Sequence, residues 1–303
     1  MRAMPLTDDV RAACAAVAER ARQVRIREDA IEAYAATLPA ESPPAPDLAP
    51  GEPDERRAAF QITLNAVNFG SGWFPTLRKQ PGMSGFRTVE AGLRERGPWS
   101  AEELAAIGRD EIAATVGGQD PAHELMGLFE TALRELGARV RDEHGGSFLA
   151  LARSAPTAEA LAEELASWPT WFDVSPYEDL RVPFFKRAQI AAADLALTGL
   201  APEAGLDRLT LFADNLVPHV LRIDGVLEFD TDLIARIDAG ELIEHDSPEE
   251  VEIRACALHA VELLVAAHPG PTTATAVDNH LWHRGGAPRY KTHPRHRART
   301  TAY

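Results

Sequence analysis

The chain has 303 residues, of which 45% are hydrophobic and 25% charged, and its formal net charge is −15 at pH 7. This acidity argues against general attraction to nucleic acid or to an anionic membrane, and no run approaches the ~20 apolar residues that span a bilayer. The start, MRAMPLTDDVRAA, holds no apolar signal segment, and Cys14 and Cys256 lie far apart in helix-like sequence. We therefore expect a cytoplasmic protein with no disulfide framework and no zinc site.

Two helices are predicted in residues 1–38. Thr7, followed by two aspartates, is typical of a helix start, and apolar residues then recur every three or four positions as far as Val24. A second short helix is predicted over residues 31–38. The segment 39–56, which begins PAESPPAPDLAPGEPDE, is rich in proline and acid. It is predicted to be a loop, either on the open surface or as a flap near a site.

The remainder, residues 57–303, is predicted to be a mainly α core that packs with the N-terminal helices as one domain. Ser100 to Glu103 forms a capping box, and Ser247 followed by proline and glutamates marks another helix start. Glu250 and Arg254 are spaced as an i,i+4 pair, expected at the surface. Further helices are predicted over residues 123–136 and 157–165, and short strands around 63–69, 181–185 and 226–229.

The last 21 residues, HRGGAPRYKTHPRHRARTTAY, carry six Lys or Arg and three His but no acid. Three interpretations remain open for this basic tail: a solvated end, a phosphate-contacting segment folded back on the body, or a weak RNA-attracting arm.

Several familiar catalytic templates are absent, including GxGxxG after a strand, GxxxxGK[ST], HExxH and GxSxG. Glu252, His259 and Glu262 share a helical face that mimics a metal set, but three such residues on one helix are more often an exposed polar stripe. We expect no metal and no cofactor.

Two segments place polar groups in apolar surroundings ahead of the middle of the chain. In TLNAVNFGSGWFPTLRK, Asn65 and Asn68 interrupt an apolar run, and glycines precede Trp73, which offers a stacking face for a planar ring. In VPFFKRAQIAAAD, Lys186 and Arg187 open a predicted helix.

Two later segments repeat the pattern. LTLFADNLVPHVL sets Asp214 and Asn215 within an apolar run, and AVDNHLWH brings four polar or aromatic residues into one or two helical turns. Those four are Asp278, Asn279, Trp282 and His283. Each segment taken singly has a structural explanation, as a buried polar residue that caps a loop or as a salt bridge.

Taken together, FFKRAQIAAAD, LTLFADNLVPHVL, EEVEIRACALHAVELL and VDNHLWH resemble the queuosine salvage protein family. NFGSGWF, the GGSFL of residues 145–149 and the basic, tyrosine-ended tail fit the same family. The resemblance covers roughly residues 60–303, and KRAQI, FAD-x-x-VP and VEIR are specific as a set.

The resemblance implies a helical fold similar to the core of DNA glycosylases, and an N-glycosidase that releases queuine from queuosine 5′-monophosphate or from the nucleoside. It places the catalytic aspartate at Asp214, the base-contacting phenylalanine at Phe212, and a second, late aspartate at Asp278. A small-molecule nucleotide agrees with the chain's acidity, and we expect no DNA, membrane or obligate protein partner.

A carboxylate at Asp214 suits this chemistry because cleavage of a ribosyl C–N bond passes through an oxocarbenium-like state, whose positive charge it stabilises in a low-dielectric pocket. It can also orient or deprotonate water, or form a transient glycosyl adduct, and the sequence leaves these routes open. Asp278 is expected to accept hydrogen bonds from a guanine-like base. Lys186 and Arg187 are candidates for binding the 5′-phosphate or for holding the helix in place.

Three positions depart from the family pattern. Asn215 replaces a tyrosine after the catalytic aspartate, His283 replaces a second acid after the tryptophan, and no histidine is found around Tyr34. Two alternatives therefore stand beside queuosine hydrolysis: a non-catalytic nucleoside- or nucleotide-binding protein, and a glycosidase for another modified purine-like nucleotide.

Overall fold

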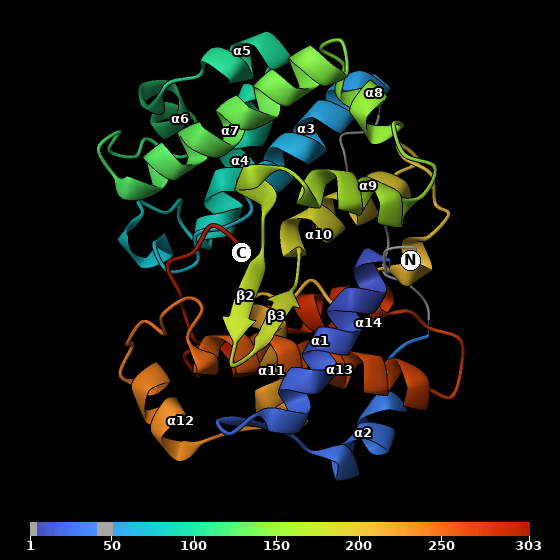
Figure 1. Cartoon of the computed structure of the whole chain (residues 1–303). Helices are drawn as coiled ribbons and strands as arrows, with labels where there is room; N and C mark the ends of the chain where they lie inside the picture. Colours follow the sequence, from blue (N-terminus) through green and yellow to red (C-terminus); the bar gives the residue numbers. More distant parts are fainter. Residues whose placement is uncertain (1–4, 41–50) are drawn as a thin grey trace. The chain divides into compact units, whose positions relative to one another are not determined.

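A computed structural model describes residues 5–40 and 51–303 (Figure 1). Helices dominate and the strands are short, which confirms the mainly α class. The chain divides into two compact units, residues 1–44, 173–189 and 205–299 in the first and residues 45–172, 190–204 and 300–303 in the second. The predicted boundaries at residues 38 and 57 stay predictions, and most of the proline-rich loop lies outside the described residues. Among the described helices, none is both long and apolar enough to cross a membrane.

Helix α13 (Pro248–Ala267) is the central element of the first unit. It begins as predicted, with the Ser247 hydroxyl accepting the Glu250 N–H at 3.3 Å. Most of its residues are buried on all sides, as expected of a core helix. Helices α1 (Leu6–Arg20), α2 (Glu28–Ala35) and α14 (Ala274–Arg284) pack against it. Cys14 and Cys256 are buried and free, so no disulfide joins them.

Two small antiparallel sheets belong to the first unit. Strand β1 (Val24–Ile26) pairs with β4 (Leu227–Phe229), and β2 (Val174–Tyr177) with β3 (Leu180–Pro183). The strands expected near residues 181–185 and 226–229 are confirmed. The helical assignment of Val24 is wrong, because α1 ends at Arg20 and the buried Val24 pairs with Phe229 instead.

The remaining elements of the first unit surround one irregular segment. Helix α10 (Lys186–Leu197) begins at Lys186 as predicted and runs on into the second unit. A short 3₁₀ turn, η3 (Leu206–Arg208), leads into residues 209–215, which form neither helix nor strand, and α11 (Leu216–Ile223) follows them. Helices α12 (Thr231–Asp238) and α15 (Pro288–Lys291) complete the unit.

Among its described residues, the second unit contains helices joined by loops and no strand. Its elements are α3 (Asp54–Ala66), η1 (Phe74–Thr76), α4 (Gly85–Arg96), α5 (Ala101–Ala106), α6 (Arg109–Thr115), α7 (Glu124–Glu143), α8 (Phe148–Ala152), α9 (Ala158–Ala166) and η2 (Pro169–Trp171). The capping box at Ser100 and the helices near 123–136 and 157–165 are confirmed. The strand predicted around residues 63–69 is wrong: residues 61–66 end helix α3 and are all buried, which removes the polar face that marks a helix in a sequence.

Close packing in this unit depends on Gly137 in α7. A β-carbon at this position would lie 2.3 Å from the Ala105 nitrogen, so only glycine permits this approach of α5. The family-like GGSFL segment has a local role as well. Glu55 of α3 accepts the N–H groups of Phe148 and Leu149 at 2.7 and 3.0 Å and so caps helix α8.

Candidate functional site

The segment of residues 209–215, here called the Asp214 loop, holds one carboxylate in buried surroundings. Leu209, Leu211 and Ala213 are fully buried, and Phe212 and Asn215 are 4% and 5% exposed. Asp214 alone within the loop is half-buried, so its side chain combines an apolar frame with access from outside.

The N-terminus of α11 fixes one oxygen of that carboxylate. Asp214 Oδ1 accepts the N–H groups of Leu216 at 2.7 Å and Val217 at 3.3 Å. These amides and the helix dipole favour negative charge at this position. Both of these hydrogen bonds are made to Oδ1, not to Oδ2.

Side chains from two helices hold the backbone of the loop on either side of Leu211. Gln189 of α10 accepts the Thr210 N–H at 2.9 Å and donates to the Phe184 carbonyl at 2.8 Å. Asp278 of α14 accepts the Phe212 N–H at 3.3 Å and is itself only 5% exposed. The two residues that the resemblance paired as base contacts, Phe212 and Asp278, therefore lie together.

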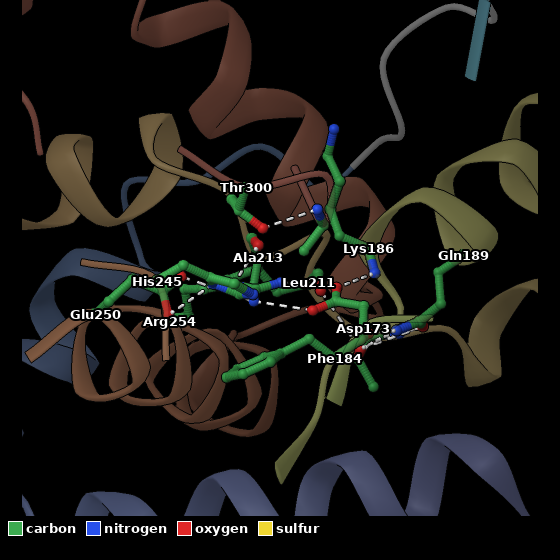
Figure 2. Close-up of polar contacts among 12 residues, drawn as sticks. Asp173, Phe184, Lys186, Gln189, Leu211, Ala213, His245, Glu250, Arg254 and Thr300 are labelled. Atoms are coloured by element: carbon green, nitrogen blue, oxygen red, sulfur yellow. Dashed lines mark hydrogen bonds and ion pairs between the residues drawn. The ribbon is translucent and has the colours of Figure 1, made fainter. Parts of the chain in front are cut away.

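A buried ion pair holds the peptide directly before Asp214 (Figure 2). Arg254 Nε of α13 donates to the Ala213 carbonyl at 3.0 Å, and its Nη1 and Nη2 donate to the two oxygens of Asp173 at 2.9 and 2.7 Å. Asp173 Oδ2 also accepts the Lys186 N–H at 3.0 Å and so caps α10. Glu250 and Arg254 do lie close together, 3.8 Å apart, but the prediction that they pair at the surface is wrong, because both side chains are fully buried.

The basic tail holds the far end of the loop. Asn215 Nδ2 donates to the His296 carbonyl at 3.2 Å, and Arg222 Nη2 donates to the Pro294 carbonyl at 2.9 Å. His219 Nε2 lies 2.8 Å from the Tyr290 carbonyl. The tail up to residue 299 is therefore folded against α11 in the first unit, and the interpretation as a solvated end is wrong.

Two cations interact electrostatically with the Asp214 carboxylate. Burial lowers the pKa of the Lys186 ammonium to about 8, and the charge of Asp214 opposes that shift. Burial likewise lowers the pKa of Arg295 in the tail, and Asp214 is the neighbour that raises it. Lys186 is 4% exposed and Arg187, the next residue, is 1% exposed.

Helix α14 carries the rest of the predicted late motif. Asp278 is buried, Asn279 and Trp282 are half-buried, and His283 is exposed with Nδ1 at 2.7 Å from the Asn279 carbonyl. Tyr34, where the family pattern led us to seek a histidine, donates its hydroxyl to Asp224 Oδ2 at 2.6 Å. Tyr34 thus supports the C-terminal end of α11.

Asn68 belongs to the second unit, whereas the other predicted site residues belong to the first. Its Nδ2 donates to Asn65 Oδ1 at 3.2 Å, and Asn65 Nδ2 donates to Asp194 Oδ2 at 2.9 Å. The role of Asn68 in substrate binding stays a prediction.

Potential metal ligands gather at one place in the described chain. Donor atoms of His245, Asp246 and Glu250 lie within 4.8 Å of one another. The pKa of His245 is raised above its ordinary value: burial lowers it, and the carboxylate of Glu250, 3.4 Å away, raises it by more. The absence of a metal stays a prediction.

The other set considered for a metal, on α13, is occupied by structural contacts. Glu252 is 1% exposed, not part of an exposed stripe, and its Oε2 accepts the N–H groups of residues 22, 23 and 24 at 3.0, 2.6 and 3.1 Å. Glu262 accepts from Arg11 Nε at 2.9 Å.

Comparison with known proteins identifies the family. The family model described as queuosine salvage protein matches residues 48–303, which include the Asp214 loop. The chain belongs to the queuosine salvage protein family.

Relatives in this family share a name. A Sphaerobacter thermophilus protein named queuosine 5′-phosphate N-glycosylase/hydrolase is 34% identical over 310 aligned positions, which cover 95% of each chain. Proteins with the same name from Mus musculus and Bos taurus are 29% and 31% identical, over 60% and 54% of this chain and 57% and 50% of their own.

Three residues at this queuosine-salvage-like site were not found from the sequence as parts of the site. Asp173 follows Trp171 and Phe172 with no motif around it, and Arg254 was recognised only as half of an i,i+4 pair. Arg295 was one of six cations in the tail. Only the VEIR motif, which contains Arg254, gave any signal for these three.

Proposed function

We propose that the protein hydrolyses the N-glycosidic bond of queuosine 5′-phosphate, giving queuine and ribose 5-phosphate. The observation that carries the proposal is Asp214, a half-buried carboxylate in a buried loop of a queuosine salvage protein family member. The relatives' shared name supports the substrate, and the geometry of the loop supports the role of the carboxylate.

In this mechanism, the C–N bond to the base breaks as positive charge develops on the ribose, and Asp214 Oδ2 stabilises that charge. The amides of Leu216 and Val217 keep the side chain oriented before the substrate arrives, so little reorganisation is needed in the transition state. Water adds its oxygen to the anomeric carbon and gives up one proton, which Asp214 can accept as a general base. The base leaves with the electrons of the C–N bond and takes up one proton at its nitrogen, so the sum of the reaction is the addition of one water.

In the proposal, different residues bind the base and the phosphate. Phe212 and Asp278, joined through the Phe212 N–H, receive the guanine-like base. Lys186 and Arg295 both act on Asp214 electrostatically, and in the proposal these two cations bind the phosphate on the same ribose. Asn215 supports the tail in the structure, so its change from the family's tyrosine need not remove a substrate contact.

The test is incubation with queuosine 5′-phosphate, with the free base followed by liquid chromatography and mass spectrometry. Wild type is expected to release queuine, and Asp214→Asn to lower kcat by at least about 10³-fold with an unchanged Tm. Asp207→Asn is the matched control, because it removes an exposed carboxylate seven positions earlier. Full activity of Asp214→Asn would refute the role given to this residue.

Two other outcomes are informative. Binding without release by the wild type would identify a non-catalytic binding protein. Release from another modified purine-like nucleotide, with none from queuosine 5′-phosphate, would mean that the substitutions at Asn215 and His283 changed the base that is recognised.

A further inference from the structure

Arg254 is buried to an extent that is unusual for an arginine, and its whole guanidinium is engaged. Its side chain has no exposure, and the ring of Phe184 lies under it at 3.9 Å from centroid to Cζ. Its contacts come from separate parts of the chain: Asp173 directly before strand β2, Ala213 in the Asp214 loop, and Glu250 in its own helix. Figure 2 shows the guanidinium between Asp173 and Glu250.

The planarity of the guanidinium turns these contacts into a constraint on direction. Nη1 and Nη2 are set by the paired oxygens of Asp173, so Nε has one orientation left, and it is aimed at the Ala213 carbonyl. That carbonyl belongs to the peptide whose nitrogen is the backbone nitrogen of Asp214. The orientation of the catalytic carboxylate is therefore connected to Asp173 through one rigid group.

The same pair also reaches the backbone of Lys186. Asp173 Oδ2 accepts hydrogen bonds from Arg254 Nη2 and from the Lys186 N–H, and Phe185, the residue directly before α10, has a φ of +50°. A non-glycine residue in this left-handed region is held there by its surroundings. The cap from Asp173 is one such restraint, so the ion pair fixes the start of α10 as well as the loop.

A hydrophobic pair of similar size would fill this space without the cost of removing two charges from water. It would supply no donor to the Ala213 carbonyl and no cap to Lys186. The ion pair therefore holds two charged residues, Asp214 and Lys186, in fixed positions relative to each other.

We propose that Arg254 is a positioning residue of the hydrolase, which acts through the Ala213 carbonyl to hold the Asp214 carboxylate, and through Asp173 to hold Lys186, in reacting geometry. This inference rests on the function proposed above for Asp214. It assigns Arg254 no contact with substrate.

The first test compares Arg254→Lys with Glu252→Gln, both on α13 and both at buried, multiply hydrogen-bonded side chains. Lysine keeps the charge but cannot hold Asp173 and Ala213 at fixed angles. A displacement near 1 Å at a reacting group costs about 10²-fold in rate. We expect kcat of Arg254→Lys to fall about 100-fold with KM within about threefold of wild type. Glu252→Gln is expected to lower Tm at least as much and leave kcat within about twofold.

The second test places Arg254→Lys in the Asp214→Asn background. A residue that acts through Asp214 adds little once that carboxylate is gone, so the two losses in kcat should be far from multiplicative. Multiplicative losses, or an equal fall in kcat for Glu252→Gln, would overturn the inference. An inert Asp214→Asn substitution would instead refute the proposed function, so the two failures are distinguishable.

Phe184→Leu provides a further measurement if Arg254→Lys does not fold. It removes the aromatic face under the guanidinium but leaves the ion pair and its charges in place. We expect a smaller fall in kcat, about tenfold, again with little change in KM. Unchanged kcat in this variant would overturn the inference.

Discussion

Helix α13 buries two charged side chains two residues apart, and they differ in what they hold. Glu252 binds three consecutive N–H groups of residues 22–24 and the Tyr177 hydroxyl, at 2.8 Å. Arg254, on the opposite side of the helix, binds Asp173 and the peptide before Asp214. Glu252 satisfies a run of backbone N–H groups, and Arg254 joins the segments that carry Asp214 and Lys186. Burial and ion pairing alone do not separate a structural role from a functional one, whereas the groups contacted do.

The largest effect on stability is expected from Arg254→Met. It leaves the Asp173 carboxylate buried without its cation, so the free energy of unfolding should fall by about 3–5 kcal/mol in urea titration. The control is Arg25→Met, which removes an exposed partner of Glu228 and should cost at most about 1 kcal/mol. Equal losses in the two variants would contradict the account of the buried pair.

Glu252→Gln should come next in size, with a loss of about 2 kcal/mol in the same titration. An amide has one acceptor oxygen where the carboxylate has two, so some of the N–H and hydroxyl donors lose their partner. Queuine release by the folded variant should remain at the wild-type rate. A large fall in kcat would show that both sides of α13 serve the site.

Acid should loosen the tail that supports Asn215. Burial lowers the pKa of His296 to about 3 and that of His219 to about 4, both below the ordinary value. The unfolded chain then binds protons that the folded chain does not, so stability is present above about pH 6.5 and is lost as the pH falls toward these folded values. Between pH 7 and 5, His296 alone should cost about 2 kcal/mol.

His296→Gln measures that contribution directly. Urea titrations at pH 7 and pH 5 should show a flatter pH dependence in the variant than in the wild type. The same slope in both proteins would mean that His296 does not titrate with unfolding.

The smallest effect is expected at Lys186. With a pKa of about 8, its ammonium is charged at pH 7 and mostly neutral at pH 9, so kcat/KM for the nucleotide should fall about tenfold over this range. The nucleoside queuosine, which lacks the phosphate, is the control substrate and should lose much less. Equal losses for both substrates would assign Lys186 to the carboxylate or the base and not to the phosphate.

Local signals in the sequence predicted much of the fold. The caps at Ser100, Thr157 and Ser247 mark true helix starts, because a hydroxyl that accepts an N–H is a contact within four residues. The error over residues 63–69 has the opposite origin. Burial on all sides is set by distant segments, and a helix without a polar face has no period to detect.

The site shows the same division. Asp214 and Asp278 were noticed as polar residues in apolar runs, but only the resemblance gave them roles and added Phe212. The spacing of Glu250 and Arg254 predicted their pairing but gave no information on burial, so the pair was placed at the surface. Asp173 and Arg295 reach the loop only through tertiary contacts, and no local pattern marks such residues.

The tail contact at Asn215 has a consequence for how the protein is made. A ribosome delivers the chain from its N-terminus, and folding begins before synthesis ends. Asp214 therefore emerges well before His296, whose carbonyl completes the hydrogen bonding of the loop. The hydrogen bonding of this loop cannot be complete before residue 296 has been made, and a chain cut short before that residue would carry the Asp214 carboxylate on an unfinished support.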